Sequence, residues 1–316
     1  MSSLPTPQIE DTSRIPGSHF KFEVVVVGSG NAGSSAALSA IDNGCKHVLL
    51  IDKCPPEWVG GNGYFTAGAY RTVHGGLADI LDIVSDVDPK LAATIDMEPY
   101  THEQFTKDIM RLSDGRSDPA LVKALVDNSH DAILWLAKRV KIPFILSFHR
   151  QAYLVDGRQK FWGGMVLAVE DGGKGLVDAH HRALKESGVE VWFNAEAIDL
   201  MRSSGKVSGL KVKKDGEVLN LEATSIILAS GGFESNREMR LKHLGPEWVN
   251  ARVSRLYLIS GINGPLRLRR FGELPTIPEK LCRWLSVQVP CSRVIGEGVI
   301  APAGMPIPQW TSATAF

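Results

Sequence analysis

The stretch that decides the fold is FEVVVVGSGNAGSSAALSAIDNGCKHVLLID, residues 22–52. A run of four valines, residues 24–27, leads into glycines at positions 28, 30 and 33, and a segment of small residues with helical character follows. A second apolar run, residues 48–51, ends at Asp52. This order predicts a strand, a glycine turn, a helix and a second strand, which is the βαβ arrangement of nucleotide-binding proteins.

Each of the three glycines has a mechanical role in such a unit. Gly28 permits the tight turn after the strand, Gly30 lets backbone N–H groups approach a pyrophosphate, and Gly33 lets the helix lie close to the sheet. The phosphates then lie at a helix N-terminus, where unpaired N–H groups and the helix dipole attract negative charge. Asp52 follows Gly28 by 24 positions, where its carboxylate can accept hydrogen bonds from an adenosine ribose. Together these features predict a nucleotide site.

The composition is that of an ordinary globular protein. The chain has 316 residues, of which 44% are hydrophobic, and its 35 basic side chains balance 35 acidic ones. This balance argues against nucleic acid or an anionic membrane as the main partner. No apolar run reaches the ~18 residues of a transmembrane helix, and the N-terminus lacks the apolar core of a signal peptide. We therefore expect a cytoplasmic protein, without a membrane span, that acts on a small molecule.

The cysteines and histidines do not predict a metal site. The four cysteines show no CxxC spacing, so we expect reduced thiols. His180 and His181 fall on an expected helix that follows the DGGKG segment at residues 171–175. Adjacent residues on a helix point ~100° apart, so these two histidines do not form a metal-binding pair.

Beyond Asp52 the pattern predicts further glycine segments, helices and an antiparallel meander. The segment EWVGGNGYFTAGAYR, residues 57–71, contains four glycines that let the backbone pass close to a flat ligand. Helices are expected between residue 79 and about residue 140, with Thr101 and Gln104 at capping-box spacing. Strands are expected at residues 197–201, 207–212, 217–221 and 225–228, the last of which leads into the glycines at 231 and 232.

Several of these segments together resemble the flavoprotein subunits of fumarate reductase and succinate dehydrogenase, with relatives that include tricarballylate and 3-ketosteroid dehydrogenases. The matching segments are GSGNAGSSAA at residues 28–37, IDK at 51–53, GGNGYFTAG at 60–68, GKGL at 173–176 and ILASGGFESNREM at 227–239. Their order and separation make the resemblance specific, and it covers about residues 22–250. The stretch through Glu238 looks most similar to the tricarballylate dehydrogenase branch.

The resemblance implies FAD as the cofactor and implies which residues hold it. Members that attach flavin covalently use a histidine in the loop that corresponds to residues 61–68, and this loop has none, so non-covalent FAD is expected. The implied contacts are Gly28, Gly30, Asn31, Ala32 and Gly33 on the pyrophosphate, Asp52 on the ribose with Lys53 beside it, Gly61, Asn62, Gly63, Ala67 and Gly68 along the ribityl chain and isoalloxazine, Ala197 at the adenine, and Ser230 and Gly231 over the pyrophosphate side.

The resemblance also implies a fold and a reaction. The expected fold class is α/β, a glutathione-reductase-like, Rossmann-type FAD-binding domain at residues 22–251 with an inserted antiparallel β element, preceded by a flexible segment at residues 1–21. The implied reaction is hydride transfer between flavin N5 and a carbon next to a carboxylate or carbonyl, which forms or reduces a C=C bond. A small polycarboxylate or an enone-type metabolite is the expected substrate, and the electron partner is not assigned. His149, Arg150 and Tyr153 are the substrate-side candidates.

Residues 252–316 depart from the family pattern. They contain seven of the 17 prolines, and seven arginines, one lysine and three glutamates give them a net charge of +5. Because proline interrupts helices, we expect a divergent tail in place of the family's capping domain and closing FAD segment, produced by a frame or splice change or by an unrelated extension. Two alternatives stay open: a non-catalytic or inactive truncated flavoprotein, and an NAD-dependent Rossmann dehydrogenase, which explains only residues 28–52.

Overall fold

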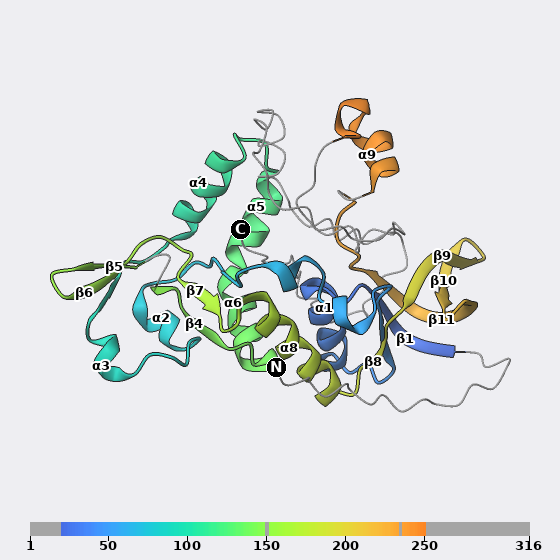
Figure 1. The fold of residues 1–316 in the computed structure, drawn as a ribbon, viewed down its shortest axis with the longest axis horizontal. Helices are drawn as coiled ribbons and strands as arrows, with labels where there is room; N and C mark the ends of the chain where they lie inside the picture. The colour runs from blue at the N-terminus through green and yellow to red at the C-terminus, as the bar shows by residue number, and fades with distance from the viewer. Residues whose placement is uncertain (1–19, 149–151, 234–235, 251–316) are drawn as a thin grey trace.

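Strand β1 (Phe20–Val27) lies inside a six-stranded sheet with the order β8-β2-β1-β11-β10-β9 (Figure 1). The structure, a computed structural model, describes residues 20–148, 152–233 and 236–250. The strands β8, β2, β1 and β11 run parallel to one another, and β9 and β10 extend the sheet as an antiparallel meander. The other strands of this sheet are β2 (Val48–Ile51), β8 (Glu190–Trp192), β9 (Ala195–Ser203), β10 (Lys206–Lys214) and β11 (Glu217–Leu228).

The valines of β1 are buried on both faces of the sheet. Val24 and Val26 belong to the large core that includes apolar side chains of helices α1 and α8, whereas Val25 and Val27 belong to a second core with the meander strands. A strand that is buried on both faces has a continuous apolar run, which explains why residues 24–27 show no alternation. The predicted strand, turn, helix and strand are confirmed, with α1 at Asn31–Asp42 and α8 at Gly172–Glu186.

Strand β11 is one continuous strand of 12 residues, although the sequence predicts two strands in this region. Its first half pairs with β10 and its second half pairs with β1. Glu222 pairs on both sides at once, with Gly209 of β10 and with Lys21 of β1. The antiparallel element is therefore continuous with the main sheet.

The N-terminal strand begins earlier than the predicted domain boundary. Phe20 and Lys21, which the sequence assigns to a flexible segment at residues 1–21, pair with Leu221 and Glu222 as part of β1. The Phe20 ring packs edge-on against Trp192, with ring centroids 5.3 Å apart, and this contact stabilises the strand end. Residues 1–19 and the predicted tail at 252–316 lie outside the described residues.

Residues 70–169 form a smaller region of helices and short strands beside the main sheet (Figure 1). The predicted capping box is confirmed, because Thr101 Oγ1 accepts a hydrogen bond from Gln104 N and Gln104 Oε1 accepts one from Thr101 N. This region contains α2 (Leu77–Leu81), α3 (Pro89–Ala92), β3 (Ile95–Met97), α4 (His102–Leu112), α5 (Pro119–Asp127), α6 (Ser129–Trp135), β4 (Phe144–Leu146), β5 (Ala152–Val155), β6 (Arg158–Phe161) and β7 (Leu167–Val169), and α9 (Arg237–Leu244) follows β11.

None of the helices in the described part of the chain has the length and apolar character needed to span a membrane. The same residues contain no group of three or more His, Cys, Asp or Glu side chains that could hold a metal ion.

Candidate cofactor site

The glycine turn after β1 is packed tightly at two of its glycines and is open at the third. A Cβ on Gly28, whose φ is +105°, would lie 2.5 Å from the carbonyl oxygen of Ala229, and a Cβ on Gly33 would overlap the carbonyl oxygen of Gly28. A Cβ on Gly30 would come no closer than 3.9 Å to other protein atoms, at Gly60 O. The fold itself requires Gly28 and Gly33, whereas Gly30 leaves a space that a ligand can enter.

The N-terminus of α1 opens into this space. Gly30 is the N-cap residue, it makes no side-chain cap, and the first turn of α1, which begins at Asn31 and Ala32, contains no acidic residue. The first N–H groups of a helix need acceptors from outside the helix, and the helix dipole favours a negative one. The residues present therefore fit a pyrophosphate at this position.

Asp52 at the end of β2 is tied to the glycine turn. Ser29 donates two hydrogen bonds to Asp52 Oδ2, from its backbone N at 2.7 Å and from its Oγ at 2.6 Å, and Cys54 N donates to Oδ1 at 2.9 Å. Burial, the charge of Asp52 and a hydrogen bond to that carboxylate raise the pKa of the Cys54 thiol to about 11, so this thiol stays protonated. A carboxylate offers about four acceptor positions, so Asp52 can still accept from ribose hydroxyls. Lys53, next in the chain, is half-buried.

The second glycine segment, residues 60–68, passes directly against the first. Gly60 has a φ of +95°, its N lies 3.5 Å from Ser29 Oγ, and a Cβ on Gly60 would overlap the side chain of Val177 in α8. Gly61 has a φ of +59°, and a Cβ there would lie 3.4 Å from the Cα of Gly30. The two glycine segments therefore border the same space. Gly61, Asn62 and Gly63 lie in a short 3-10 helix, Gly61–Phe65, and Ala67 is exposed just beyond it.

The start of α8 holds the far end of this segment in place. Gly173 N donates to Thr66 O at 2.9 Å, and a Cβ on Gly173 would overlap the carbonyl oxygen of Gly63. A Cβ on Gly68, whose φ is +64°, would lie 2.9 Å from the backbone of Gly172. The glycines of the DGGKG segment thus let α8 pack closely against the second glycine segment.

A third segment reaches the glycine turn at the end of β11. Ala229 N donates to Val27 O at 2.8 Å, and Ser230 Oγ donates to the same oxygen at 3.5 Å. Gly231 has a φ of +73°, and a Cβ there would meet no described atom within 4 Å. Ser230 therefore lies beside the first glycine turn, and Gly231 follows it in the chain; their contact with the pyrophosphate stays a prediction.

Ala197 lies on β9, opposite Val212 of β10. The start of β9 is attached to the second strand of the βαβ unit, because Ala195 N donates to Asp52 O at 2.9 Å. Ala197 is thus two residues beyond a direct contact with the Asp52 backbone.

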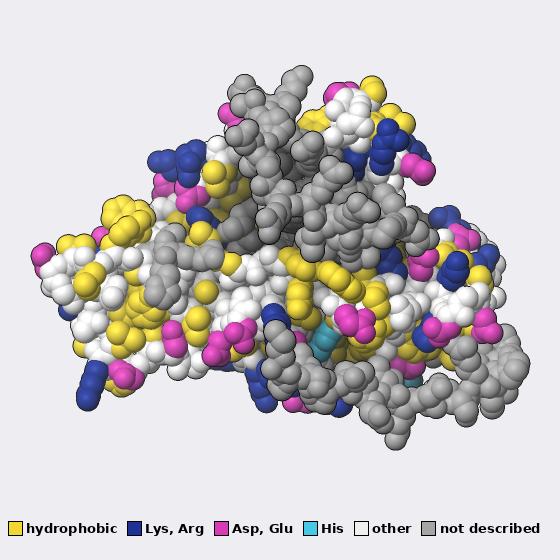
Figure 2. Space-filling model, in the orientation of Figure 1, with side chains coloured by type: hydrophobic (Ala, Val, Ile, Leu, Met, Phe, Trp, Pro, Cys, Tyr) yellow, Lys and Arg dark blue, Asp and Glu magenta, His cyan; other side chains and the backbone are white. Residues whose placement is uncertain are grey.

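Of the three substrate-side candidates, Tyr153 alone lies within the described residues, and it lies away from these glycine segments. His149 and Arg150 lie outside the described residues. Tyr153 is 64% exposed on β5, and Figure 1 shows the β5–β6 hairpin at the opposite end of the molecule from the main sheet. In the space-filling view hydrophobic side chains gather over this hairpin, where Leu154 and Trp162 are also exposed (Figure 2). The role of these three candidates stays a prediction.

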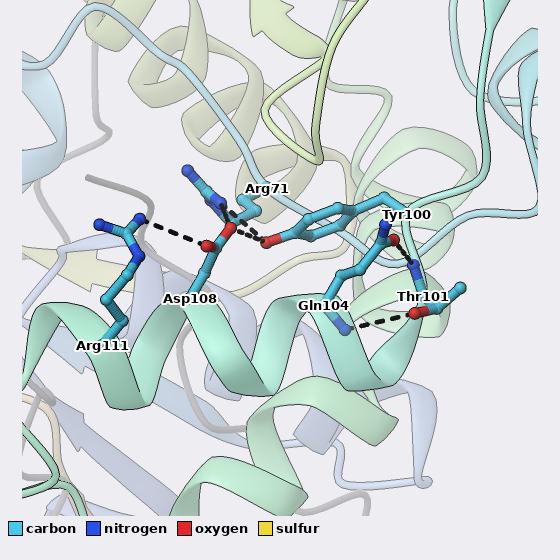
Figure 3. Close-up of polar contacts among 6 residues, drawn as sticks. All are labelled: Arg71, Tyr100, Thr101, Gln104, Asp108 and Arg111. Atoms are coloured by element: carbon cyan, nitrogen blue, oxygen red, sulfur yellow. Dashed lines mark hydrogen bonds and ion pairs between the residues drawn. The ribbon is translucent and has the colours of Figure 1, made fainter.

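A network centred on Asp108 fixes the chain just after the second glycine segment (Figure 3). Arg71 Nη1 donates to Tyr100 OH at 2.8 Å and to Asp108 Oδ2 at 3.1 Å, and Tyr100 OH donates to the same Oδ2 at 2.8 Å. Burial and the hydrogen bond to Asp108 raise the pKa of Tyr100 to about 12. Burial opposes ionisation of Asp108, but hydrogen bonds from Tyr100 and Arg111 and the arginine charges hold the pKa of this carboxyl below its usual value. Arg71 is therefore paired within the fold.

A polar contact between α8 and α1 completes the site. His180 Nε2 lies 2.7 Å from Oδ1 of Asn31. The two residues are 149 positions apart, so no local sequence pattern indicates the contact, and the sequence treats His180 only as a helical histidine without a metal.

The comparison with known proteins identifies the family. Residues 23–302 match the family described as "FAD binding domain". This chain belongs to that family. The α/β fold class and the flavoprotein character expected from the resemblance are therefore confirmed. The match runs on beyond residue 252, so it gives no boundary there, and the predicted divergent tail stays a prediction.

The relatives include reductases of several kinds. A cytochrome-type fumarate reductase from Shewanella frigidimarina is 31% identical over 236 residues, which are 72% of this chain and 36% of the relative. A urocanate reductase from Eggerthella lenta is 30% identical over 70% of this chain and 33% of its own length, and an NADH:fumarate oxidoreductase from Klebsiella pneumoniae is 28% identical over 70% and 22%. This chain thus spans about a third or less of these relatives. They support the fumarate reductase branch and not the predicted tricarballylate dehydrogenase branch.

Solved structures show the same fold. The open conformation of a flavocytochrome c3 fumarate reductase matches with a TM-score of 0.57 and 25% identity over 77% of this chain and 39% of that chain. A 3-ketosteroid delta1-dehydrogenase from Sterolibacterium denitrificans matches with a TM-score of 0.54 and 16% identity over 70% and 50%, and this likeness concerns the fold alone.

Proposed function

We propose that this chain holds FAD non-covalently and takes part in the reduction or formation of a C=C bond next to a carboxylate or carbonyl group. The observation that carries the proposal is the meeting of two glycine segments around Gly30. Gly61 lies against Gly30, and Gly30 itself has room for a ligand. A dinucleotide turn alone fits NAD as well as FAD, but the second glycine segment and the family match favour FAD.

The residues of the site have separate tasks in this proposal. Gly30 and the first N–H groups of α1 bind the pyrophosphate, and Asp52, held by Ser29, accepts hydrogen bonds from the ribose. The segment 61–68 supplies backbone along the isoalloxazine, and it contains no histidine for a covalent bond. When bound, FAD supplies hydride transfer at N5.

The names of the relatives point to a substrate class. Three of them are named for fumarate, urocanate and acrylate. All three compounds are α,β-unsaturated carboxylates, which accept hydride at a carbon conjugated with the acid group. We propose a substrate of this class, with a cationic side chain on the carboxylate to stabilise the charge that develops during transfer. His149 and Arg150 remain proposals for that role.

The activity can be tested with the full chain loaded with FAD. Under anaerobic conditions, a reduced viologen dye is offered as electron donor together with fumarate, urocanate or acrylate. The proposal predicts dye oxidation that requires both one of these acids and bound FAD, and no oxidation with the corresponding saturated acid. FAD-loaded protein that oxidises no dye with any unsaturated acid would favour the alternative of a flavin-binding chain without turnover.

A further inference from the structure

His180 is a buried polar side chain of α8 that contacts the start of α1 at the candidate pyrophosphate site. Its side chain is only 2% exposed, and its Nε2 lies 2.7 Å from the side-chain Oδ1 of Asn31. Asn31 is the first residue of α1, immediately after Gly30. The contact thus joins a buried side chain of α8 to Asn31, the residue that follows Gly30.

The second ring nitrogen of His180 decides which way the hydrogen bond runs. Nδ1 is buried and has no hydrogen-bond partner within the described residues. A neutral imidazole carries one N–H, and an amide oxygen only accepts hydrogen bonds. With the proton on Nδ1, that N–H would be buried without an acceptor and Nε2 would face Oδ1 with no hydrogen between them, so neither nitrogen would be satisfied. The proton therefore lies on Nε2, which donates to the carbonyl oxygen of the Asn31 amide.

The ring stays neutral at physiological pH. Burial, with a smaller contribution from the neighbouring His181, lowers the pKa of His180 to about 3. A neutral ring has no net charge with which to attract the pyrophosphate. Any influence of His180 on the anion must therefore pass through the group that it contacts. That group is the Asn31 amide.

We propose that His180 is a positioning residue for the FAD pyrophosphate, which holds the Asn31 amide with its Oδ1 toward α8 and so leaves the Nδ2–H groups to donate to a phosphate oxygen. An amide can rotate to present either oxygen or nitrogen, and the oxygen would repel a phosphate. By accepting from His180, Oδ1 is fixed away from the anion, and only the donor end is available to it. This inference rests on the proposed binding of FAD.

The test measures FAD affinity and the stability of the apoprotein in four variants of the full chain. His180→Leu replaces the donor with an apolar side chain of similar size. His180→Gln replaces the imidazole with a side chain that still has an N–H donor. Asn31→Ala removes the amide itself. Leu184→Val is the matched control, because Leu184 lies one turn further along α8, is equally buried and makes no polar contact.

We expect His180→Leu to raise the Kd for FAD about tenfold, as for the loss of one hydrogen bond to a charged group. We expect His180→Gln to stay within about threefold of the wild type, and Leu184→Val to lower Tm without changing the Kd. In the Asn31→Ala background, His180→Leu should have no further effect on the Kd, because the two residues act as one unit.

Three results would overturn the inference: an unchanged Kd in His180→Leu, an equal loss of affinity in the Asn31→Ala background, or a ¹⁵N-histidine spectrum of the wild type that puts the proton on Nδ1. The spectrum is recorded on the wild type, so the inference can be overturned even if His180→Leu does not fold. A wild-type chain that binds no FAD would instead contradict the proposed function, and the two failures are thereby separate.

Discussion

The hydroxyl of Ser29 donates a hydrogen bond of 2.6 Å to the carboxylate of Asp52, and this bond joins the glycine turn after β1 to the end of β2. The residue between two glycines therefore does more than continue the turn. It sets the position of the acid that is expected to bind the ribose, and Gly60 N approaches the same hydroxyl at 3.5 Å.

Ser29→Ala should weaken FAD binding through this bond. The variant keeps the backbone hydrogen bond to Asp52 but loses the one from Oγ, so the carboxylate is less restricted. We expect the FAD affinity to fall about threefold to tenfold, which corresponds to about 1 kcal/mol. Isothermal titration with FAD measures the change, and Ser39→Ala, in α1 and away from Asp52, is the control. Equal affinities in wild type and Ser29→Ala would show that the bond has no part in cofactor binding.

Two glycine substitutions should separate folding from cofactor binding. Gly33→Ala introduces a Cβ that would overlap Gly28 O, so we expect a loss of unfolding free energy of about 3 kcal/mol, because tightly packed backbone cannot move aside. Gly30→Ala meets no protein atom closer than 3.9 Å and has a φ of −65°, so the apoprotein should keep its stability. Its added methyl group occupies the space assigned to the pyrophosphate, and FAD affinity should fall at least tenfold.

Denaturant unfolding of the apoproteins and titration with FAD measure the two effects. The assignment of the space at Gly30 would be wrong if Gly30→Ala bound FAD as tightly as the wild type.

Buried histidines should make the apoprotein less stable in mild acid. His180 binds a proton near pH 6.5 when unfolded but only near pH 3 when folded, so between these values the unfolded state holds more protons. The stabilisation is present above pH 6.5 and is lost as the pH falls, by about 1.4 kcal/mol per pH unit from this residue. Burial lowers the pKa of His74 and His181 as well, which gives the same sign.

Chemical denaturation between pH 7 and pH 5 checks this dependence. In His180→Leu the slope of unfolding free energy against pH should be smaller than in the wild type by the contribution of one bound proton, about 1.4 kcal/mol per pH unit. An identical slope in both proteins would mean that His180 is accessible to protons in the folded state.

The Asp108 network should contribute to the free energy of unfolding, and the ion pair with Arg71 should contribute more than the ion pair with Arg111. Asp108→Ala leaves Arg71, which is largely buried, without its carboxylate, and we expect a loss of about 1–2 kcal/mol. Arg111→Ala is the matched control, since this side chain is 65% exposed and its ion pair should contribute less than about 0.5 kcal/mol. Thermal unfolding of both variants measures the difference. Equal shifts in Tm would contradict the view that Arg71 is the partner that depends on Asp108.

The sequence predicts the βαβ unit because its signals are local. The valines of β1, the glycines of the turn and Asp52 at the end of β2 lie within 31 residues, and each has its own steric or electrostatic reason. The capping box at Thr101 is predicted for the same reason. The break predicted inside β11 is wrong, because Glu222 keeps pairing with strands on both sides, and that depends on partners distant in sequence.

Contacts between distant segments account for what the sequence does not show. The Asn31–His180 contact and the bond from Arg71 to Asp108 depend on where α8 and α4 pack, and neither has a periodic or motif-like signal. The close approach of Gly173 to Gly63 is of the same kind. The family resemblance indicates these glycines, but only the fold shows which atoms a side chain would overlap.

The visible absorbance spectrum of the purified full chain, recorded before and after acid precipitation, tests the central claim most directly. The site at Gly30, with Asp52 and the second glycine segment beside it, predicts a flavin spectrum whose chromophore passes into the supernatant and is identified there as FAD. Flavin that stays with the precipitate would contradict non-covalent binding. A folded, colourless chain that also fails to bind added FAD would contradict the assignment of the site.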